Sequence, residues 1–534
     1  MSSTIKRNKL MDNYGWVQNT SNLSTIRDTI DLVPDHGIRH LELRERIREY
    51  RCANNDLPKY WSWDARCRIK AIHACGLVKL NRHIQGYELT DLGQQLKSCP
   101  KATDHLRGKR ILTTEEIDIF CNGLLTNPPV IRVLELLNRE RRTTNIGLTK
   151  YEIGEQLGFV GDPGFTHLDP VWIASSGYSF HNKEGDADKW ARTILSWLRQ
   201  VGWAYLAEER ATICGKTLSR YKATSEIDNI LRYNVKRVER NVPSEMLCSE
   251  KHPFPKLIQK RRVVILGFLL RKAQRKEEAL ILELVNELRD NGIEADDNLV
   301  LFEIISLRQA GFHIHQLGPY LKLDDKVCLD VNPELLSNIT EESETEIEKL
   351  IEKLVVQYED TIPAKLVDGL VRYGYDGSEG INFEITVAQF FRYLGYKTEY
   401  FGQGRGRTAD VIARYINKIY ARSYGIIIDS KATSDKYTFP AGDIRKMKEY
   451  IDLHGRELLK DSIPLHAFAF VSSCFCEDVA SPLKEISEDT GIKGTAIEVL
   501  KLLEFGCLLT KGKLYIENMY PAYITNSTFD VGNL

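Results

Sequence analysis

Hydrophobic and polar positions along the chain repeat one arrangement three times. In each copy, a stretch with helical spacing ends in Gly followed by an apolar residue, and two short alternating stretches joined by a turn come next. The Gly is typical of a helix C-terminus, and the alternating stretches predict a β-hairpin. The three copies lie at residues 68–93, 191–224 and 302–325.

A helix followed by a hairpin forms the second half of a winged-helix domain. Such domains often place one helix in the major groove of DNA. Winged helices also serve as protein-interaction modules, and a single copy would leave both interpretations open. Three copies in tandem favour DNA binding by at least one of them.

The pattern changes after the third copy. Residues 332–362 are rich in Glu and Lys, with Leu350, Ile351, Leu354 and Val355 at helical spacing, which predicts a charged helical connector. A helix over 382–394 follows, and strand-like and helical stretches then alternate to the end, which is typical of an α/β domain. We therefore expect an α+β multidomain protein. Its predicted parts are three winged-helix-like subdomains (1–143, 144–248 and 249–333), a helical linker (334–362) and an α/β domain (363–534).

Composition supports several domains and excludes a membrane protein. The chain has 534 residues, 43% of them hydrophobic and 28% charged, which fits a water-soluble protein with more than one core. No apolar run is long enough to span a bilayer, and the first ten residues lack the apolar segment of a secretory signal. We expect no membrane partner and a cytoplasmic location.

Cysteine usage and charge refine this picture. The 11 cysteines are scattered, which indicates reduced thiols. Cys474 and Cys476 form a C-x-C pair but have no second pair at zinc spacing nearby, so we favour core thiols over a metal site. The net charge of −1 argues against a nucleic-acid partner, but eight basic residues between 256 and 276 are compatible with a local basic surface.

The segment 424–434, "YGIIIDSKATS", predicts a buried strand that ends in charged residues. A second strand-like run covers 409–415, and a short polar connection separates the two. Folding them as a hairpin about residues 418–420 places Asp410 beside Asp429. Alternation along the strand sends Asp429 and Lys431 to one face and the Ser430 side chain to the other. Two carboxylates and an ammonium group therefore converge at one end of the hairpin.

This cluster suits phosphodiester hydrolysis. Two adjacent acids raise each other's pKa unless a cation lies between them. Asp410, Asp429 and a backbone carbonyl at Ser430 would make a hard, open oxygen site for Mg²⁺. Lys431 could orient the attacking water or stabilise the transition state. Glu384, on the preceding helix, could add a ligand or hold a water molecule.

The arrangement D-(x)n-(D/E)-x-K resembles the PD-(D/E)xK nucleases. The bare pattern is weak, because an acid two residues from a Lys is common at strand ends. Similar blocks, in the same order as in type IIS restriction endonucleases, extend the resemblance over nearly the whole chain. They lie at residues 14–19 (YGWVQN), 127–137 (NPPVIRVLELL), 157–168 (LGFVGDPGFTHL), 184–192 (EGDADKWAR), 424–432 (YGIIIDSKA), 439–451 (FPAGDIRKMKEYI) and 468–473 (FAFVSS).

The resemblance implies a recognition part followed by a Mg²⁺-dependent cleavage domain that cuts both strands of double-stranded DNA outside a short asymmetric site. The catalytic residues of the family fall on Asp410, Asp429 and Lys431. One departure is that the Pro before the first Asp is Ala409 here. Because that Pro shapes the entry to the strand and is not a ligand, we expect activity to persist.

The family's base-reading residues can be placed where the blocks match. They fall on Gln18, Asn19, Arg39 and Trp61 in the first subdomain, and on Asn182, Glu184 and Lys189 in the second. Asn and Gln suit adenine, Arg and Lys suit guanine, and Glu can accept from cytosine. Because these residues persist, the resemblance implies a recognition site close to GGATG, the site of a member of that family. The plainer interpretation of 184–192 is a helix start with Asp186 or Asp188 as its cap and Trp190 in the core.

The family also implies a transient homodimer of cleavage domains. The aligned charged pair is Arg445 and Glu449, with the two signs exchanged relative to the family. A two-fold interface is self-complementary, so reversing both charges preserves the pairing. The simpler interpretation is an ordinary surface pair within one helix. Alternatives for the whole protein are a strand-specific nicking endonuclease, a non-catalytic DNA-binding regulator and a winged-helix scaffold for protein partners.

Overall fold

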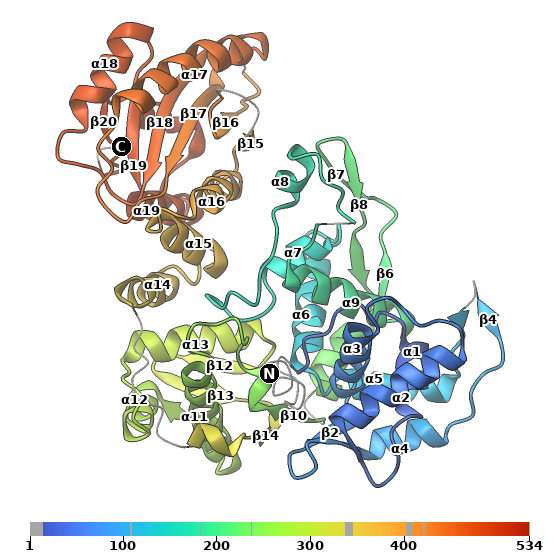
Figure 1. The fold of residues 1–534 in the computed structure, drawn as a ribbon. Coiled ribbons are helices and arrows are strands. Elements are labelled where there is room, and N and C mark those ends of the chain that lie inside the picture. Colours follow the sequence, from blue (N-terminus) through green and yellow to red (C-terminus); the bar gives the residue numbers. More distant parts are fainter. Residues whose placement is uncertain are drawn as a thin grey trace, which may run out of the picture. The chain divides into compact units, whose positions relative to one another are not determined.

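The computed structural model describes residues 14–106, 109–181, 183–235, 238–336, 345–401, 408–419 and 422–532. The chain divides into two compact units. Unit 1 comprises Met1–Leu168 and Glu184–Ser343, and unit 2 comprises Asp169–Lys183 and Glu344–Leu534. Each unit is described by itself (Figure 1).

Unit 1 is mainly helical with small sheets. Its elements up to residue 143 are α1 (Leu23–Ile30), β1 (Ile38–Arg39), α2 (His40–Ala53), α3 (Trp61–Ala74), β2 (Val78–Asn81), β3 (Gly86–Leu89), α4 (Asp91–Ser98), β4 (His105–Leu106), β5 (Lys109–Arg110), α5 (Thr114–Leu124) and α6 (Pro128–Thr143). The next are α7 (Lys150–Glu155), α9 (Asp186–Gln200), β6 (Ala204–Leu206), β7 (Ala211–Ile213), β8 (Lys216–Leu218), β9 (Tyr221–Ala223) and α10 (Ile227–Asn229). The last are β10 (Glu239–Pro243), α11 (Pro255–Gln274), β11 (Ala279–Leu280), α12 (Ile281–Asp290), α13 (Asp297–Gln309), β12 (Ile314–Leu317), β13 (Tyr320–Leu323) and β14 (Lys326–Asp330).

The three repeats predicted from the sequence are present as helix and hairpin. Helix α3 leads into the antiparallel pair β2–β3, α9 into β6–β9 with β7–β8 at its tip, and α13 into β12–β13. Gly76, Gly202 and Gly311 follow the three helices with φ of 64°, 79° and 101°. Only Gly adopts this left-handed conformation without strain, which explains why Gly ends each helix.

The basic stretch at 256–276 lies partly in the interior, which corrects the expectation of a basic surface there. Arg261 and Arg262 of α11 are buried and pair with Glu303 of α13, at 3.1 and 2.7 Å. Lys260 is also buried. Burial of these charges is tolerated because the carboxylate lies between both guanidinium groups. Three of the eight basic residues of this stretch are therefore buried rather than part of a basic surface.

A second, partly buried ion network connects this repeat to α6. His313 Nε2 lies 2.5 Å from the carboxylate of Glu135, and its Nδ1 lies 3.1 Å from that of Asp325, which also pairs with Arg240. Burial lowers the pKa of His313, but the two carboxylates outweigh it and raise the pKa to about 9. The imidazolium is thus charged at neutral pH and holds the two elements together.

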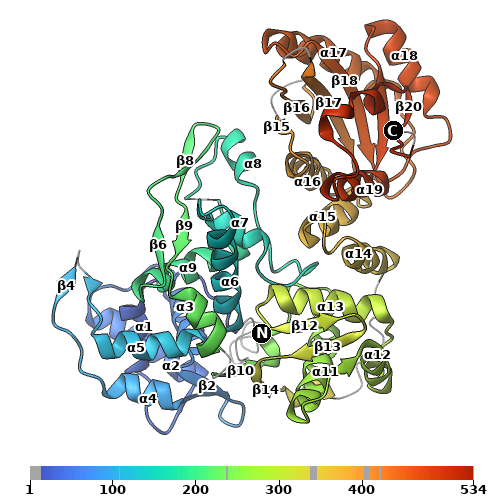
Figure 2. The same cartoon turned by 180° about the vertical axis from the view of Figure 1, so that it is seen from behind.

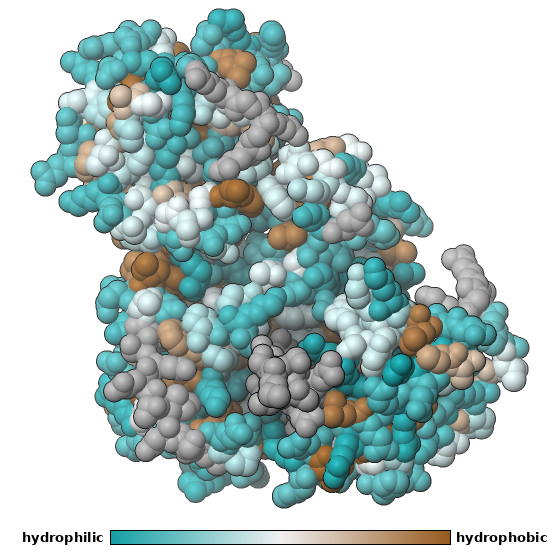
Figure 3. All heavy atoms as spheres, viewed as in Figure 1, coloured by the Kyte–Doolittle hydropathy of each residue, from teal (hydrophilic) through white to brown (hydrophobic). Residues whose placement is uncertain are grey.

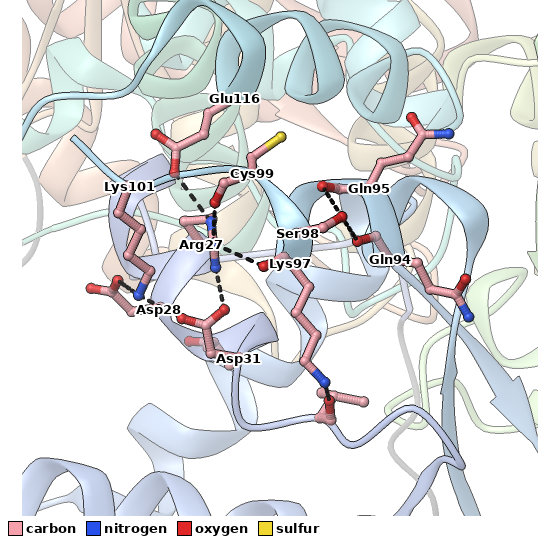
Figure 4. Close-up of polar contacts among 12 residues, drawn as sticks. Arg27, Asp28, Asp31, Gln94, Gln95, Lys97, Ser98, Cys99, Lys101 and Glu116 are labelled. Carbon is pink, nitrogen blue, oxygen red and sulfur yellow. Dashed lines mark hydrogen bonds and ion pairs between the residues drawn. The ribbon is translucent and has the colours of Figure 1, made fainter.

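A buried arginine lies upstream of the first repeat, on α1 (Figure 4). Arg27 of α1 is 2% exposed, donates to the carbonyl of Cys99 at 3.1 Å, and pairs with Asp31 and with Glu116 of α5. Lys101 approaches Asp31 from the other side, at 2.5 Å. The network ties α1 to the end of α4 and to α5.

Unit 2 contains a central sheet flanked by helices (Figure 2). Its strands, in spatial order, are β15 (Lys397–Tyr400), β16 (Val411–Tyr415), β17 (Tyr424–Lys431), β18 (Leu465–Ser472), β19 (Gly494–Glu498) and β20 (Ser527–Thr528). The first three pair antiparallel and the rest pair parallel. The helices are α8 (Pro170–Ser175), α14 (Glu346–Gln357), α15 (Ala364–Gly374), α16 (Gly380–Tyr393), α17 (Ala441–Lys460), α18 (Ala480–Thr490) and α19 (Val499–Thr510).

Strand β17 is buried along its length because helices pack on the sheet from both sides. Ile427 packs with Met447 and Leu458 of α17 in a cluster that also includes residues of α18. Helix α16 contacts β15, β16 and β17, and α19 contacts β19 and α15. The predicted α/β architecture of the C-terminal part is present, and the predicted connector forms α14, whose Ile351, Leu354 and Val355 are buried.

One segment joins unit 2 from an unexpected place in the chain. Asp169 begins the insertion, accepts from Val171 and Trp172 at the start of α8, and pairs in two contacts with Arg392 of α16, at 2.8 and 3.1 Å. Its carboxylate is almost fully buried. The sequence contains no local signal for this contact, since 223 residues separate the partners.

The described surface on the face in Figure 3 is mainly hydrophilic, with small separate hydrophobic patches. Leu317 and Tyr60 are among the most exposed large apolar side chains. Within the described residues, no helix has the length and hydropathy to cross a membrane. All 11 cysteines are free thiols, as expected.

Candidate active site

The register of one β-hairpin brings two acidic residues together. Val411 pairs with Ile428 across the antiparallel strands β16 and β17, so Asp410 and Asp429 lie opposite each other where the paired region ends. The backbone N–H of Ser430 donates to Asp410 Oδ2 at 2.7 Å. The hairpin predicted from alternation is therefore confirmed, and it fixes the separation of the two carboxyl groups.

The two carboxyl groups differ in exposure to water. Asp429 is 3% exposed, whereas Asp410 is partly exposed. Burial raises the pKa of Asp410 well above its usual range, and the nearby charges of Asp429 and Glu384 raise it further. Burial also raises the pKa of Asp429, although Lys431 opposes the shift. Two acids in this position are electrostatically unfavourable without additional positive charge.

Lys431 supplies one positive charge beside this pair. Its Nζ lies 2.8 Å from Asp429 Oδ2 and 3.6 Å from Asp443 Oδ2. Burial lowers the pKa of Lys431, but Asp429, Asp410 and Asp443 together raise it above its ordinary value. The ammonium group is therefore held in its charged form, on the same face of the sheet as Asp429.

Asp443 was not among the predicted site residues. It lies in the first turn of α17 and accepts from Tyr437 Oη at 2.9 Å and from Lys446 Nζ at 2.8 Å. Burial raises the pKa of Asp443, but its hydrogen bond with Lys446, the charge of Lys431 and the Tyr437 hydroxyl lower it below the ordinary value. The only sequence signal was an acid just after Pro440, at the start of a helix.

Glu384 and Ser430 complete the surroundings. Glu384 of α16 is 6% exposed and accepts from Tyr400 Oη at 3.1 Å. Its charge contributes to raising the pKa of Asp410. Ser430 is buried, and its Oγ has no hydrogen-bond partner among the described residues.

The chemistry of these donors fits Mg²⁺. Asp410 and Asp429 offer hard oxygen atoms, and one ammonium group does not balance two adjacent carboxylates. Within the described residues, no group of three or more His, Cys, Asp or Glu side chains is arranged to hold a metal ion. An incomplete set of protein ligands suits Mg²⁺, because this ion usually keeps several water molecules.

The predicted base-reading residues of the first subdomain differ in exposure. Asn19 and Arg39 are exposed, and Asn19 has a φ of 66°. Gln18 is half-buried. Trp61 is the first residue of α3, and the guanidinium group of Arg48 lies 5.1 Å from the centre of its ring. The structure does not contain DNA, so their roles stay predictions.

In the second subdomain, the predicted readers already have protein partners. The side chain of Glu184 is 8% exposed, pairs with Lys150, and accepts from Arg192 at 2.9 and 3.1 Å. Lys189 is half-exposed and lies 3.0 Å from Asp186. Asn182 lies outside the described residues. For Glu184 to read a base, it would have to leave two cationic partners.

The plainer interpretation of this segment also holds. Helix α9 begins after Gly185, and Asp188 accepts from the N–H of Gly185 at 2.8 Å. Trp190 is 4% exposed and packs in the core. The start of α9 is therefore rigidly fixed, which a recognition helix requires in any case.

The predicted dimer residues lie on one helix. Arg445 and Glu449 of α17 are separated by 3.9 Å, and Arg445 is largely exposed. This distance is that of an ordinary pair one helical turn apart. The single chain shows that both side chains are accessible, and it leaves the interface as a prediction.

The C-terminal part of the chain matches a known family. Residues 341–530 match the family model "FokI, cleavage domain", and this range includes every candidate catalytic residue. The type II restriction enzyme FokI from Planomicrobium okeanokoites is 25% identical over 498 residues, covering 86% of this chain and 80% of that protein. The chain resembles FokI. The type II restriction enzyme StsI from Streptococcus sanguinis is 24% identical over 484 residues, covering 83% of this chain and 76% of StsI.

Solved structures of FokI agree in fold. The structure of FokI covers 97% of this chain with a TM-score of 0.64 and 20% identity. The structure of FokI bound to DNA covers 98% with a TM-score of 0.65. These matches show a multidomain α+β fold. The family-model and sequence matches show a site-specific deoxyribonuclease that resembles the type II restriction enzyme FokI.

Asp443→Asn should lower the rate of DNA cleavage about tenfold, since Lys431 would lose its second carboxylate and sample other positions. DNA affinity should not change. Single-turnover cleavage at saturating Mg²⁺ measures the rate, and fluorescence anisotropy without metal measures binding. Glu488→Gln, an exposed acid on α18 of the same unit, is the matched control. A cleavage rate equal to the wild type would contradict the role given to Asp443.

Proposed function

We propose that the protein binds a short asymmetric site in double-stranded DNA and hydrolyses a phosphodiester bond in each strand outside that site, with Mg²⁺ as cofactor. The observation that carries the proposal is the adjacent pair Asp410 and Asp429 beside Lys431, within the segment that matches a cleavage-domain family. A domain with only a structural role gains nothing from two adjacent acids that repel each other, one of them buried.

Each residue of the site has a distinct task. The carboxylates of Asp410 and Asp429, with the backbone carbonyl of Ser430, would hold Mg²⁺, which supplies positive charge to the phosphodiester and lowers the pKa of water. Lys431 donates hydrogen bonds to the phosphate oxygen atoms on which negative charge increases. Glu384 orients a water molecule at the edge of the site. Strands β16 and β17 keep these groups in position before DNA arrives.

Unit 1 would recognise the DNA. Its three helix-and-hairpin repeats support winged-helix subdomains at residues 1–143, 144–248 and 249–333, followed by a linker at 334–362 and the nuclease domain at 363–534. Reading of the bases is assigned to seven residues from the first two subdomains, and their identities suit a sequence close to GGATG. These are Gln18, Asn19, Arg39, Trp61, Asn182, Glu184 and Lys189.

Cutting of both strands requires two active sites or two successive events at one site. We propose a transient homodimer in which Arg445 of each copy meets Glu449 of the other. The exchange of signs relative to the family supports this arrangement, because a two-fold axis brings each charge to its opposite. A strand-specific nicking endonuclease would share the catalytic residues but would not form this interface.

The function is tested by digestion of a plasmid of known sequence in the presence of Mg²⁺, with run-off sequencing of the ends. The wild-type protein should give fixed cut positions on one side of a recurring sequence. Asp429→Ala should reduce cleavage at least a thousandfold while binding the same DNA, because it removes a carboxylate from the metal site. Cutting by that variant at the wild-type rate, or no cutting by either protein, would contradict the assignment.

The dimer is tested by mixing two single charge reversals. Arg445→Glu and Glu449→Arg should each slow double-strand cleavage about tenfold or more at low enzyme concentration, since like charges then face each other across the axis. An equimolar mixture should recover activity, because the mixed dimer restores opposite charges at both contacts. A pair that acts only within one helix would show no recovery on mixing, and this result would exclude the interface.

A further inference from the structure

A buried histidine lies behind the first catalytic carboxylate. His454 of α17 is 1% exposed. Its Nε2 lies 2.8 Å from Thr408 Oγ1 and 3.3 Å from the backbone nitrogen of Ala409. These two residues directly precede Asp410. The ring therefore contacts the chain where it enters the active site.

The other ring nitrogen determines which proton the histidine carries. His454 Nδ1 lies 2.7 Å from Glu457 Oε2, and a carboxylate can only accept. Nδ1 is thus the protonated nitrogen, and Nε2 is left as an acceptor for the N–H of Ala409 and the hydroxyl of Thr408. Glu457, one turn farther along α17, fixes the tautomer that this contact requires.

Asp410 is fixed from the other side by Phe401, the residue that follows β15. The backbone N–H of Phe401 donates to the carbonyl of Asp410 at 3.1 Å, and the ring of Phe401 packs against His454 with 4.9 Å between the ring centres. The side chain of Asp410 in turn accepts from Ser430. Residue 409 is Ala, which does not restrict its own φ as a Pro would. The hydrogen bond from the Ala409 N–H to His454 restricts the backbone at residue 409, which the Ala side chain alone does not do.

We propose that His454 is a positioning residue that holds Asp410 in place for binding the divalent cation, with Glu457 fixing its tautomer. The inference rests on the proposed function, because it assigns Asp410 to the metal site. His454 is too deeply buried to contact DNA, and it contacts the backbone before Asp410 rather than any reacting group. His454 therefore affects cation binding and cleavage only by fixing the position of the Asp410 carboxylate.

The test compares two substitutions of similar size. His454→Gln retains an oxygen that can accept from Ala409 and Thr408, whereas His454→Leu retains bulk without an acceptor. Titration calorimetry with Mg²⁺ alone, without DNA, measures cation affinity. Single-turnover cleavage and DNA affinity without metal are measured on the same preparations. His466→Leu, at a half-buried histidine of β18 that pairs with Gly425 and whose ring lies against Gly455 of α17, is the matched control.

His454→Leu should weaken Mg²⁺ binding about tenfold and slow cleavage by a similar factor, while DNA affinity stays within twofold of the wild type. His454→Gln should recover most of both losses, and His466→Leu should change neither. If His454→Leu does not fold, Glu457→Ala, at a partly exposed position, should weaken Mg²⁺ binding in the same direction by a smaller factor.

Two results would overturn the inference. One is wild-type Mg²⁺ affinity in His454→Leu, or in Glu457→Ala if the first variant does not fold. The other is equal loss in His454→Gln and His454→Leu, which would show that the imidazole acts through its shape and not as an acceptor. A wild-type protein that neither binds Mg²⁺ nor cuts DNA would refute the proposed function itself, so the two failures are distinguishable.

Discussion

The active site depends on one electrostatic conflict, the placement of two carboxylates side by side at the end of a β-hairpin. The antiparallel register of β16 and β17 makes this contact unavoidable, since pairing Val411 with Ile428 places Asp410 against Asp429. The surrounding structure offsets part of the repulsion. Ser430 donates a backbone hydrogen bond to one acid, and Lys431 pairs with the other. The charge that remains unbalanced is what makes the site suitable for a divalent cation.

The elements around the hairpin serve to keep this unfavourable pair in place. The apolar face of α17 packs on β17, and the first turn of the same helix holds Lys431 through Asp443. Farther along, His454 contacts the residues before Asp410. Helix α17 therefore supports both Lys431, at the end of β17, and Asp410, just before β16. Because the exposed side of α17 also carries Arg445 and Glu449, the proposed dimer would be built on the element that fixes the active site.

Sequence reasoning succeeded where structure is local. The three helix–Gly–hairpin repeats and the meeting of Asp410 with Asp429 follow from alternation, turn residues and short connections. It did not predict the ion pairs between residues that lie far apart in the sequence. The pattern near residue 260 suggested a basic surface. Glu303, which neutralises Arg261 and Arg262, lies some forty residues farther along the chain, and no local sequence pattern connects it to them. Asp443 and His454 were missed for the same reason, and a partner for Glu184 in Lys150 could not be foreseen.

The central claim is that Asp410 and Asp429 together bind a divalent cation. Crystals of the full chain grown with Mn²⁺ in place of Mg²⁺ would test it most directly, through the anomalous signal of the metal. The account predicts one anomalous peak within bonding distance of an oxygen atom of each carboxylate, and its loss in Asp410→Asn. A fully occupied peak elsewhere in the cleavage domain with none between these two residues would contradict it.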